Sequence, residues 1–319
     1  PCLQGTAKPY RGKEDFNVKP SYREYKANTP QAYRNYAEYI FQFAARYGAA
    51  SVENESLLLL KQNQQPLSGL DLIAGLEVWN EPDKWWKGRT AYFHPFEYAA
   101  FLSANYDGHE GEMGPGVGLK KADPNLPMIM GGLAETNLDY LLAIKHWSEH
   151  NRNGSFPAEV LNFHHYSNNA GGQKGKATAA ISPERDSLKV RMEKLVLFRN
   201  QNFSAQEVWL TEFGYDSNPE SVQGSPALGP WSAAEVQAIW LLRSYLAIAA
   251  SGLDRAYLYM LRDVNALNPN KYNSSGLVAE KWNKHAPKPS YAAIKSFMEL
   301  LGDYYFVQRI EQEEKDVYL

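Results

Sequence analysis

The chain has 319 residues, which is enough for one large barrel or two ordinary domains, and its hydrophobic fraction of 44% supports a real core. No apolar run is long enough to cross a bilayer, and the formal net charge of −3 gives no reason to expect nucleic acid or an anionic membrane surface as partner. Cys2 is the only cysteine, which excludes an intrachain disulfide and a cysteine-rich metal site.

The first part of the chain predicts a strand end, a loop and a helix. Residues 1–5 have the pattern of the tail of a strand, and the polar residues 6–28 are typical of a long surface loop. Thr29–Pro30 predicts a helix start, apolar residues at helical spacing continue the helix, and Gly48 ends it. Residues 49–69 are interpreted as an excursion before the next strand.

The next strand leads to the first candidate catalytic residue. The apolar run Leu72–Val78 predicts a buried parallel strand, and Pro82 should stop it, because proline cannot donate to a sheet ladder. Glu81 should then lie at the carboxyl end of the strand, where α/β barrels place catalytic groups. The alternative is an Asn-Glu-Pro turn with a solvated glutamate. Nearby tryptophans favour a sugar site, because flat rings cover the apolar faces of pyranoses: Trp79, Trp85 and Trp86.

A helix, a loop, a strand and a second helix follow. The first helix starts near Pro95, and the loop over 106–118 is rich in glycine and acidic residues. Its oxygens could bind Ca²⁺, although the EF-hand spacing is absent. The strand is predicted over Pro127–Gly132 and the second helix over Leu138–His150.

Val160–Tyr166 predicts another strand that ends in polar side chains. Because neighbouring strand residues point to opposite faces, His164 and Tyr166 should line one face while His165 points toward the helices. If the register were shifted by one residue, His165 would line that face in place of His164 and Tyr166.

The remaining chain alternates in the same way, and its first strand, Glu207–Glu212, ends in a second glutamate. The other predicted elements are a mobile loop over 167–181, a helix from Ser182–Pro183, a long loop over 215–231, a helix from the capping box Ser232–Glu235 to Ser251–Gly252, a strand over Arg255–Leu261, a helix over Lys288–Leu301, and a strand-like tail over 303–319.

Two strand-terminal glutamates can meet at one mouth of a barrel, and glycoside hydrolysis needs such a carboxyl pair. The segments Trp79–Pro82 and Thr211–Gly214 resemble the fourth-strand and seventh-strand signatures of clan A glycoside hydrolases, retaining (β/α)8-barrel enzymes that include families 5 and 39. By that resemblance Glu81 is the acid/base, Asn80 holds the sugar 2-hydroxyl and Glu212 is the nucleophile. His164 and Tyr166 match the His-x-Tyr end of the sixth strand, whose side chains flank the nucleophile.

The resemblance implies an α/β fold, a (β/α)8 TIM barrel, in which residues 1–302 carry strands three to eight. The first two strands have no candidate here, and the second-strand arginine of the family is not found. Residues 303–319 are expected to start a C-terminal β-rich segment. The eighth strand departs from the family, because Tyr259 lies where many clan A enzymes place tryptophan.

The sequence therefore predicts a retaining glycoside hydrolase that cleaves O-glycosidic bonds, with β favoured, in an oligo- or polysaccharide by double displacement. The negative charge of Glu212 should raise the pKa of Glu81, so that the acid is protonated in the free enzyme. We expect no metal, no cofactor, no nucleic-acid or membrane partner, and a secreted or periplasmic location. The substrate-binding candidates are Asn80, His164, Tyr166, Trp85, Trp86, Trp231, Tyr259 and Trp282.

Two alternatives stay open. The first is a catalytically inactive carbohydrate-binding barrel, which the missing arginine favours. The second is a metal-dependent hydrolase that uses His164, His165 and the glutamates. It would need ligand histidines at several strand ends, and one strand end alone offers them.

Overall fold

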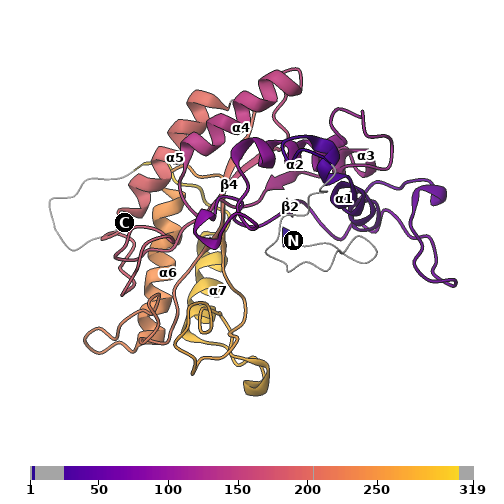
Figure 1. Ribbon diagram of the computed structural model, residues 1–319. Coiled ribbons are helices and arrows are strands. Elements are labelled where there is room, and N and C mark those ends of the chain that lie inside the picture. The colour runs from indigo at the N-terminus through magenta and orange to yellow at the C-terminus, as the bar shows by residue number, and fades with distance from the viewer. Residues whose placement is uncertain (1, 4–24, 204, 309–319) are drawn as a thin grey trace. The chain divides into compact units, whose positions relative to one another are not determined.

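The computed structural model describes residues 2–3, 25–203 and 205–308 (Figure 1). The chain divides into two compact units, residues 1–164 with 205–207, and residues 165–204 with 208–319. Most of the predicted surface loop over 6–28 lies outside the described residues, and so does the end of the predicted C-terminal β segment, 309–319.

The first unit contains four neighbouring parallel strands. Their order is β1 (Cys2–Leu3), β2 (Leu76–Val78), β3 (Met128–Met130) and β4 (Val160–His164). The predicted strands are thus found, but the one expected over 72–81 is wrong at both ends. Its first residue, Leu72, is 67% exposed, and pairing stops at Val78 rather than at Pro82.

Helices connect these parallel strands, which cannot be joined by tight turns. The longer helices are α1 (Arg34–Tyr47), α2 (Pro95–Asp107) and α4 (Leu138–Asn151), and α2 lies beside both α1 and α4 (Figure 1). Gly48 ends α1 as predicted, and Glu97 accepts a hydrogen bond from the His94 N–H at the start of α2, 3.0 Å. The shorter helices are η1 (Pro30–Tyr33), η2 (Asn54–Ser56), η3 (Trp85–Lys87) and α3 (Leu119–Ala122).

Trp79 lies in the core of this unit, with no exposed surface. Its ring packs edge-on against three aromatic rings: Tyr36 of α1 at a centroid distance of 5.9 Å, Phe93, which precedes α2, at 5.6 Å, and Phe101 of α2 at 5.8 Å. The expectation that Trp79 belongs to the aromatic surface beside Glu81 is therefore wrong. Its left-handed backbone, φ 77°, breaks the strand alternation directly after β2 and turns the indole toward the helices.

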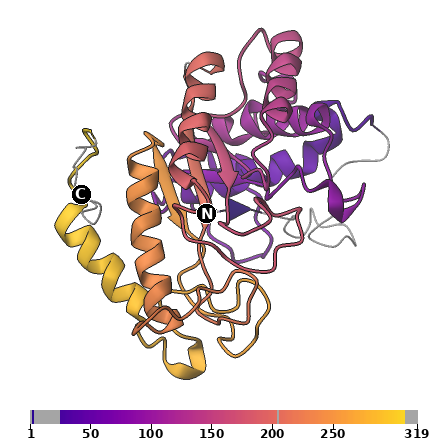
Figure 2. The same cartoon turned by 90° about the vertical axis from the view of Figure 1, so that its left-hand side faces the viewer.

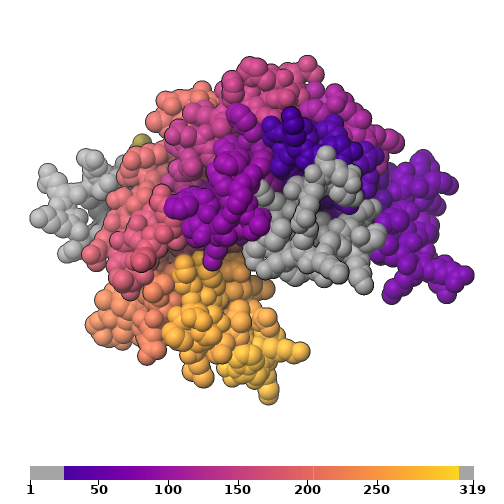
Figure 3. Space-filling model, in the orientation of Figure 1, coloured from indigo at the N-terminus to yellow at the C-terminus, as the bar shows by residue number. Residues whose placement is uncertain are grey.

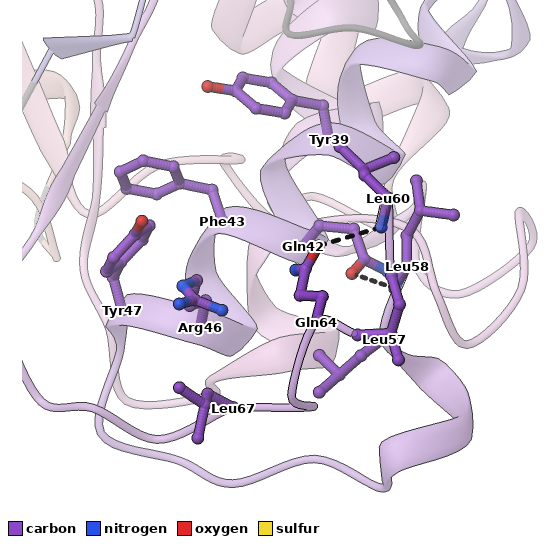
Figure 4. A pocket seen from close by; sticks show the side chains of 11 residues that line it. Tyr39, Gln42, Phe43, Arg46, Tyr47, Leu57, Leu58, Leu60, Gln64 and Leu67 are labelled. Carbon is purple, nitrogen blue, oxygen red and sulfur yellow. Dashed lines mark hydrogen bonds between the residues drawn. The ribbon is translucent and has the colours of Figure 1, made fainter. Parts of the chain in front are cut away.

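The predicted excursion between α1 and β2 is confirmed as a projecting segment over 49–72, at the right of Figure 3. Gln42 of α1 fastens it, since its amide donates to the Ser56 carbonyl, 2.7 Å. The same amide accepts from the Leu58 N–H, 2.8 Å (Figure 4). A pocket of about 330 Å³ lies between the helix and this segment. Aromatic and leucine side chains dominate its lining and no carboxylate contributes, so this pocket does not offer the chemistry that the glutamates suggest.

The second unit repeats the pattern of strand and helix. Strand β5 (Glu207–Phe213) pairs in parallel with β6 (Arg255–Leu258), with an irregular register between Leu210 and Phe213. Its helices are α5 (Leu188–Asn202), α6 (Ala233–Ala249), η4 (Lys281–Asn283) and α7 (Pro289–Leu301), and α6 and α7 lie side by side (Figure 2).

Several predicted boundaries in this unit are wrong. The helix expected from Ser182–Pro183 begins only at Leu188, because residues 183–187 form turns. The strand expected over 255–261 ends at Leu258. Residues 303–308, the described part of the tail, form no strand, and the domain boundary at 302/303 stays a prediction. The capping box at Ser232–Glu235 is present as predicted.

Candidate active site

Glu81 lies in the loop after β2 and contacts His164, the last residue of β4. The imidazole Nδ1 is 3.1 Å from the Glu81 carboxylate, and both side chains belong to the first unit. The Glu81 N–H donates to the Gly132 carbonyl, 3.0 Å, and Glu81 has a left-handed backbone, φ 48°. Such a conformation costs a non-glycine residue about 1–3 kcal/mol and clusters at functional sites. The loop therefore presents this carboxylate at the expense of backbone strain.

A second carboxylate, which the sequence did not single out, lies on the other side of the imidazole. The Oε1 atom of Glu77 is 3.8 Å from His164 Nε2 and accepts a hydrogen bond from the Gly132 N–H, 3.1 Å. Glu77 is buried in β2, so its charge acts in a medium that screens it less than water. His164 thus lies between two acidic groups, one of which is the predicted acid/base.

Glycine is required at position 132, just after β3, because the backbone there lies against the His164 ring. A Cβ atom on Gly132 would lie 2.1 Å from the imidazole Nε2, far inside van der Waals contact. The side chain of His164 is fully packed and cannot retreat without losing its contact with Glu81. The glycine after the apolar segment 127–131 could have indicated a close approach of another residue to the backbone, but the sequence analysis did not use it.

We expect Gly132→Ala to lower the unfolding free energy by about 1–3 kcal/mol, because the methyl group overpacks the His164 site. Urea unfolding measures the change. Gly116→Ala is the matched control, since a Cβ atom there meets nothing within 4 Å and its backbone is not left-handed. Equal effects of the two substitutions would contradict the close contact.

Asp83 anchors the loop that carries Glu81. Its carboxylate is 3% exposed and accepts hydrogen bonds from the backbone N–H groups of Ala134, 2.8 Å, and Glu135, 3.1 Å, in the loop after β3. Burial raises the pKa of Asp83 to about 7, against the lowering effect of those two hydrogen bonds. The sequence marked Asp83 merely as the residue after Asn-Glu-Pro.

The raised pKa predicts a pH-dependent stability. Because the pKa of Asp83 in the folded protein exceeds its ordinary value of 3.8, folding takes up a proton between about pH 4 and pH 7, and stability falls as the pH rises through that window. Asp83→Asn should remove this pH-dependent change in the free energy of unfolding, which is at most about 4 kcal/mol. Urea unfolding of both proteins at pH 4.5 and pH 8 measures it, with the exposed Asp139→Asn as control. Parallel pH curves for wild type and Asp83→Asn would contradict the prediction.

Glu212 lies near the end of β5, in the second unit, and has Tyr166 as its partner. The phenol donates a hydrogen bond to Glu212 Oε2, 2.8 Å, and the His165 N–H donates to the Glu212 carbonyl, 2.9 Å. The side chain of His165 contacts Asp186 instead, 2.5 Å from Nε2 to Oδ2, in a buried site. The predicted register is confirmed, and the alternative that gave the role to His165 is wrong.

Tyr272 completes an aromatic group that the sequence analysis missed. Its ring lies 5.1 Å from that of Tyr166 and 5.7 Å from that of Tyr259, edge-on to both. The Tyr272 hydroxyl is 3.4 Å from the side chain of Gln173. The three tyrosines therefore form one contiguous cluster, in which the buried Tyr166 donates a hydrogen bond to Glu212.

A buried carboxylate holds Tyr272 in place. The Asp216 side chain, which is fully buried, accepts hydrogen bonds from the backbone N–H of Tyr272, 3.1 Å, and of Ser274, 3.2 Å, and from the Ser221 hydroxyl, 2.5 Å. Burial raises the pKa of Asp216. Tyr272 has a left-handed backbone, φ 69°, so its loop is held in a costly conformation. No periodicity marks this loop in the sequence.

The predicted tryptophans lie in short helices or loops, three of them exposed and Trp86 partly exposed. Trp85 is 59% exposed and packs edge-on against Trp86, with 6.1 Å between ring centroids, in η3 of the first unit. Trp231, 50% exposed, precedes α6, and Trp282, 64% exposed, lies in η4 of the second unit. Asn80 is partly buried. A role of these side chains in binding sugar stays a prediction.

The acidic loop after α2 uses its oxygens within the protein. Arg152 donates to both carboxylate oxygens of Asp107, 3.0 and 2.9 Å, and Glu110 accepts from Asn153 and Ser155. These contacts favour a structural role of the loop over a Ca²⁺ site. His164 and His165 face different partners, Glu81 and Asp186.

No protein-family model matches the chain, and no curated protein matches it. Among solved structures, it resembles a family 39 glycoside hydrolase from the gut symbiont Bacteroides cellulosilyticus WH2, with 18% sequence identity and a TM-score of 0.50, over 75% of this chain and 43% of that chain. An α-L-arabinofuranosidase from Thermotoga maritima is similar with 14% identity and a TM-score of 0.49, over 80% of this chain and 45% of that chain.

The chain spans less than half the length of these two structures. None of its described helices is both long and apolar enough to span a membrane. At 18% identity the comparison establishes the architecture: the chain shares the parallel β/α fold of the family 39 glycoside hydrolase.

Proposed function

We propose that this protein is a retaining glycoside hydrolase in which Glu212 is the nucleophile and Glu81 the acid/base. The hydrogen bond from Tyr166 to Glu212 carries the proposal. A phenol that donates to a carboxylate favours the ionised form, which a nucleophile needs before it attacks. Glu81 has a different partner, the imidazole of His164, so the two glutamates have distinct surroundings, as an acid and a nucleophile require.

The proposal includes the (β/α)8 barrel, with β1 to β6 as its third to eighth strands and 303–319 as the start of a C-terminal β-rich segment. In such a barrel the loops after all strands meet at the carboxyl face, where barrel enzymes place their catalytic groups. The parallel pairing of β1 through β4, and of β5 with β6, supports this arrangement.

The reaction proceeds in two displacements. Glu212 attacks the anomeric carbon while Glu81 gives its proton to the leaving oxygen, which produces a covalent glycosyl-enzyme. Glu81, now ionised, takes a proton from a water molecule as the water oxygen attacks the anomeric carbon. The bond between the sugar and Glu212 breaks, which releases the sugar and restores the Glu212 carboxylate. The two carboxyl groups should be about 5 Å apart, since no water has to fit between nucleophile and sugar.

The substrate is an oligo- or polysaccharide, and a β-glycosidic bond is favoured. Asn80 would hold the 2-hydroxyl, and the partly exposed Tyr259 and Tyr272, which belong to the tyrosine cluster beside Glu212, offer rings and hydroxyl groups. The exposed indoles of Trp85, Trp231 and Trp282, and the partly exposed indole of Trp86, suit the apolar faces of further sugar units. A secreted or periplasmic location would give access to such polymers.

Hydrolysis of aryl β-glycosides tests the proposal. Proton NMR should show that the sugar first released keeps the β configuration, and chelator should leave the rate unchanged. The α anomer as first product would indicate an inverting enzyme. Binding of oligosaccharides without turnover would instead favour the inactive carbohydrate-binding barrel, and loss of activity with chelator would favour a metal-dependent hydrolase.

A further inference from the structure

Three potential metal ligands lie together on the last turns of α4, apart from the candidate active site. His146, Glu149 and His150 occupy positions i, i+3 and i+4, which share one face of a helix. One ligand atom from each lies within 4.8 Å of the others, and the two imidazole centroids are 4.4 Å apart. All three side chains are exposed, so an ion can reach them from solvent.

The hydrogen bond of His150 decides which of its ring nitrogens can bind an ion. Its Nδ1 lies 2.9 Å from the carbonyl oxygen of His146, and a carbonyl can only accept, so Nδ1 carries the proton. In the neutral ring the lone pair is then on Nε2. Histidines that bind metal characteristically donate their other ring N–H to a carbonyl or carboxylate in this way, which fixes the tautomer and the ring orientation. His150 thus has a ligand's tautomer before any ion is bound.

The donor set selects the ion. Two imidazole nitrogens and one carboxylate oxygen suit Zn²⁺, whereas Ca²⁺ and Mg²⁺ prefer oxygen ligands alone. Zinc is commonly bound by three protein ligands with water in the fourth position. Lys145, whose ammonium group is 3.8 Å from Glu149, competes for the carboxylate, but an exposed pair of this kind contributes little.

We propose that His146, Glu149 and His150 bind one Zn²⁺ ion at the C-terminal end of α4, with a fourth position open to water. The ion would cross-link the last turn of the helix, whose final carbonyls lack intrahelical partners. This site does not depend on the proposed hydrolase activity, because all three ligands belong to one helix of the first unit.

Isothermal titration of the metal-free protein with zinc chloride tests the site. The wild type should bind one equivalent with a dissociation constant in the low-micromolar range. His146→Ala and His150→Ala should each abolish this binding, and Glu149→Gln should weaken it about tenfold, because a neutral amide oxygen is a poorer ligand than a carboxylate. His285→Ala, which removes an exposed histidine of the other unit, should leave it unchanged.

Circular dichroism of each variant without zinc checks that α4 still folds, since substitutions on an exposed helix face should preserve the helix. Binding that persists at the same affinity in His150→Ala would overturn the proposal. Absence of one-equivalent binding by the folded wild type up to millimolar zinc would overturn it as well. Because binding is read directly, a failure of the hydrolase proposal would not affect either outcome.

Discussion

Glu212→Ala should lose about 10⁴-fold to 10⁶-fold in kcat on every glycoside substrate, the scale seen when the nucleophile of a covalent hydrolase is removed. The alanine methyl cannot attack the anomeric carbon, so the first displacement lacks its nucleophile. Initial rates on activated aryl glycosides measure the loss. Because attack by the nucleophile and departure of the leaving group belong to the same displacement, a better leaving group should not restore the rate.

Two further variants make this result specific. Glu207→Ala removes an exposed glutamate from the other end of the same strand, β5, and should leave kcat within a factor of two or so. Tyr166→Phe deletes the hydrogen bond to Glu212 and should lower kcat about tenfold, in line with roughly 1.4 kcal/mol for one such bond to a charged group. Retained activity in Glu212→Ala, with the variant folded, would exclude Glu212 as nucleophile.

Strand alternation explains why Tyr166 could be placed from the sequence. The apolar run Val160–Phe163 fixes β4, and period two then separates His165 from its neighbours, as the contacts with Glu212 and Asp186 confirm. The same argument failed at Trp79, because alternation ends where the backbone becomes left-handed. A hydrophobic pattern therefore predicts the interior of a strand better than the residues directly after it.

The residues that the sequence analysis missed depend on contacts distant in the chain. Tyr272 is held by Asp216, which is 56 positions away, and Asp83 binds amides 51 and 52 positions away. Glu77 lies within the run that was treated as apolar, and its contact with His164 depends on the pairing of β2, β3 and β4. Local patterns carry no information about such pairs, whereas the strand-terminal glutamates could be found because their motifs are local.

Glu81→Ala should behave differently from Glu212→Ala, and the difference tests the mechanism. A 2,4-dinitrophenyl leaving group needs little protonation, so formation of the glycosyl-enzyme should survive on that substrate. The second displacement lacks its base, and the intermediate should accumulate. Rapid mixing should therefore show a burst of dinitrophenol equal to the enzyme concentration, followed by slow turnover, while substrates with poor leaving groups should lose about 10²-fold to 10⁴-fold in rate.

Azide provides the decisive step of this experiment. It is a small anion that needs no base, and the space left by the Glu81 carboxyl, beside His164, should admit it. Azide should therefore restore turnover of the aryl substrate in Glu81→Ala and yield a β-glycosyl azide, because two inversions retain the configuration. In Glu212→Ala no glycosyl-enzyme exists, so azide could only displace the leaving group once and give the α product. If Glu81→Ala shows neither the burst nor the β azide, Glu81 is not the acid/base.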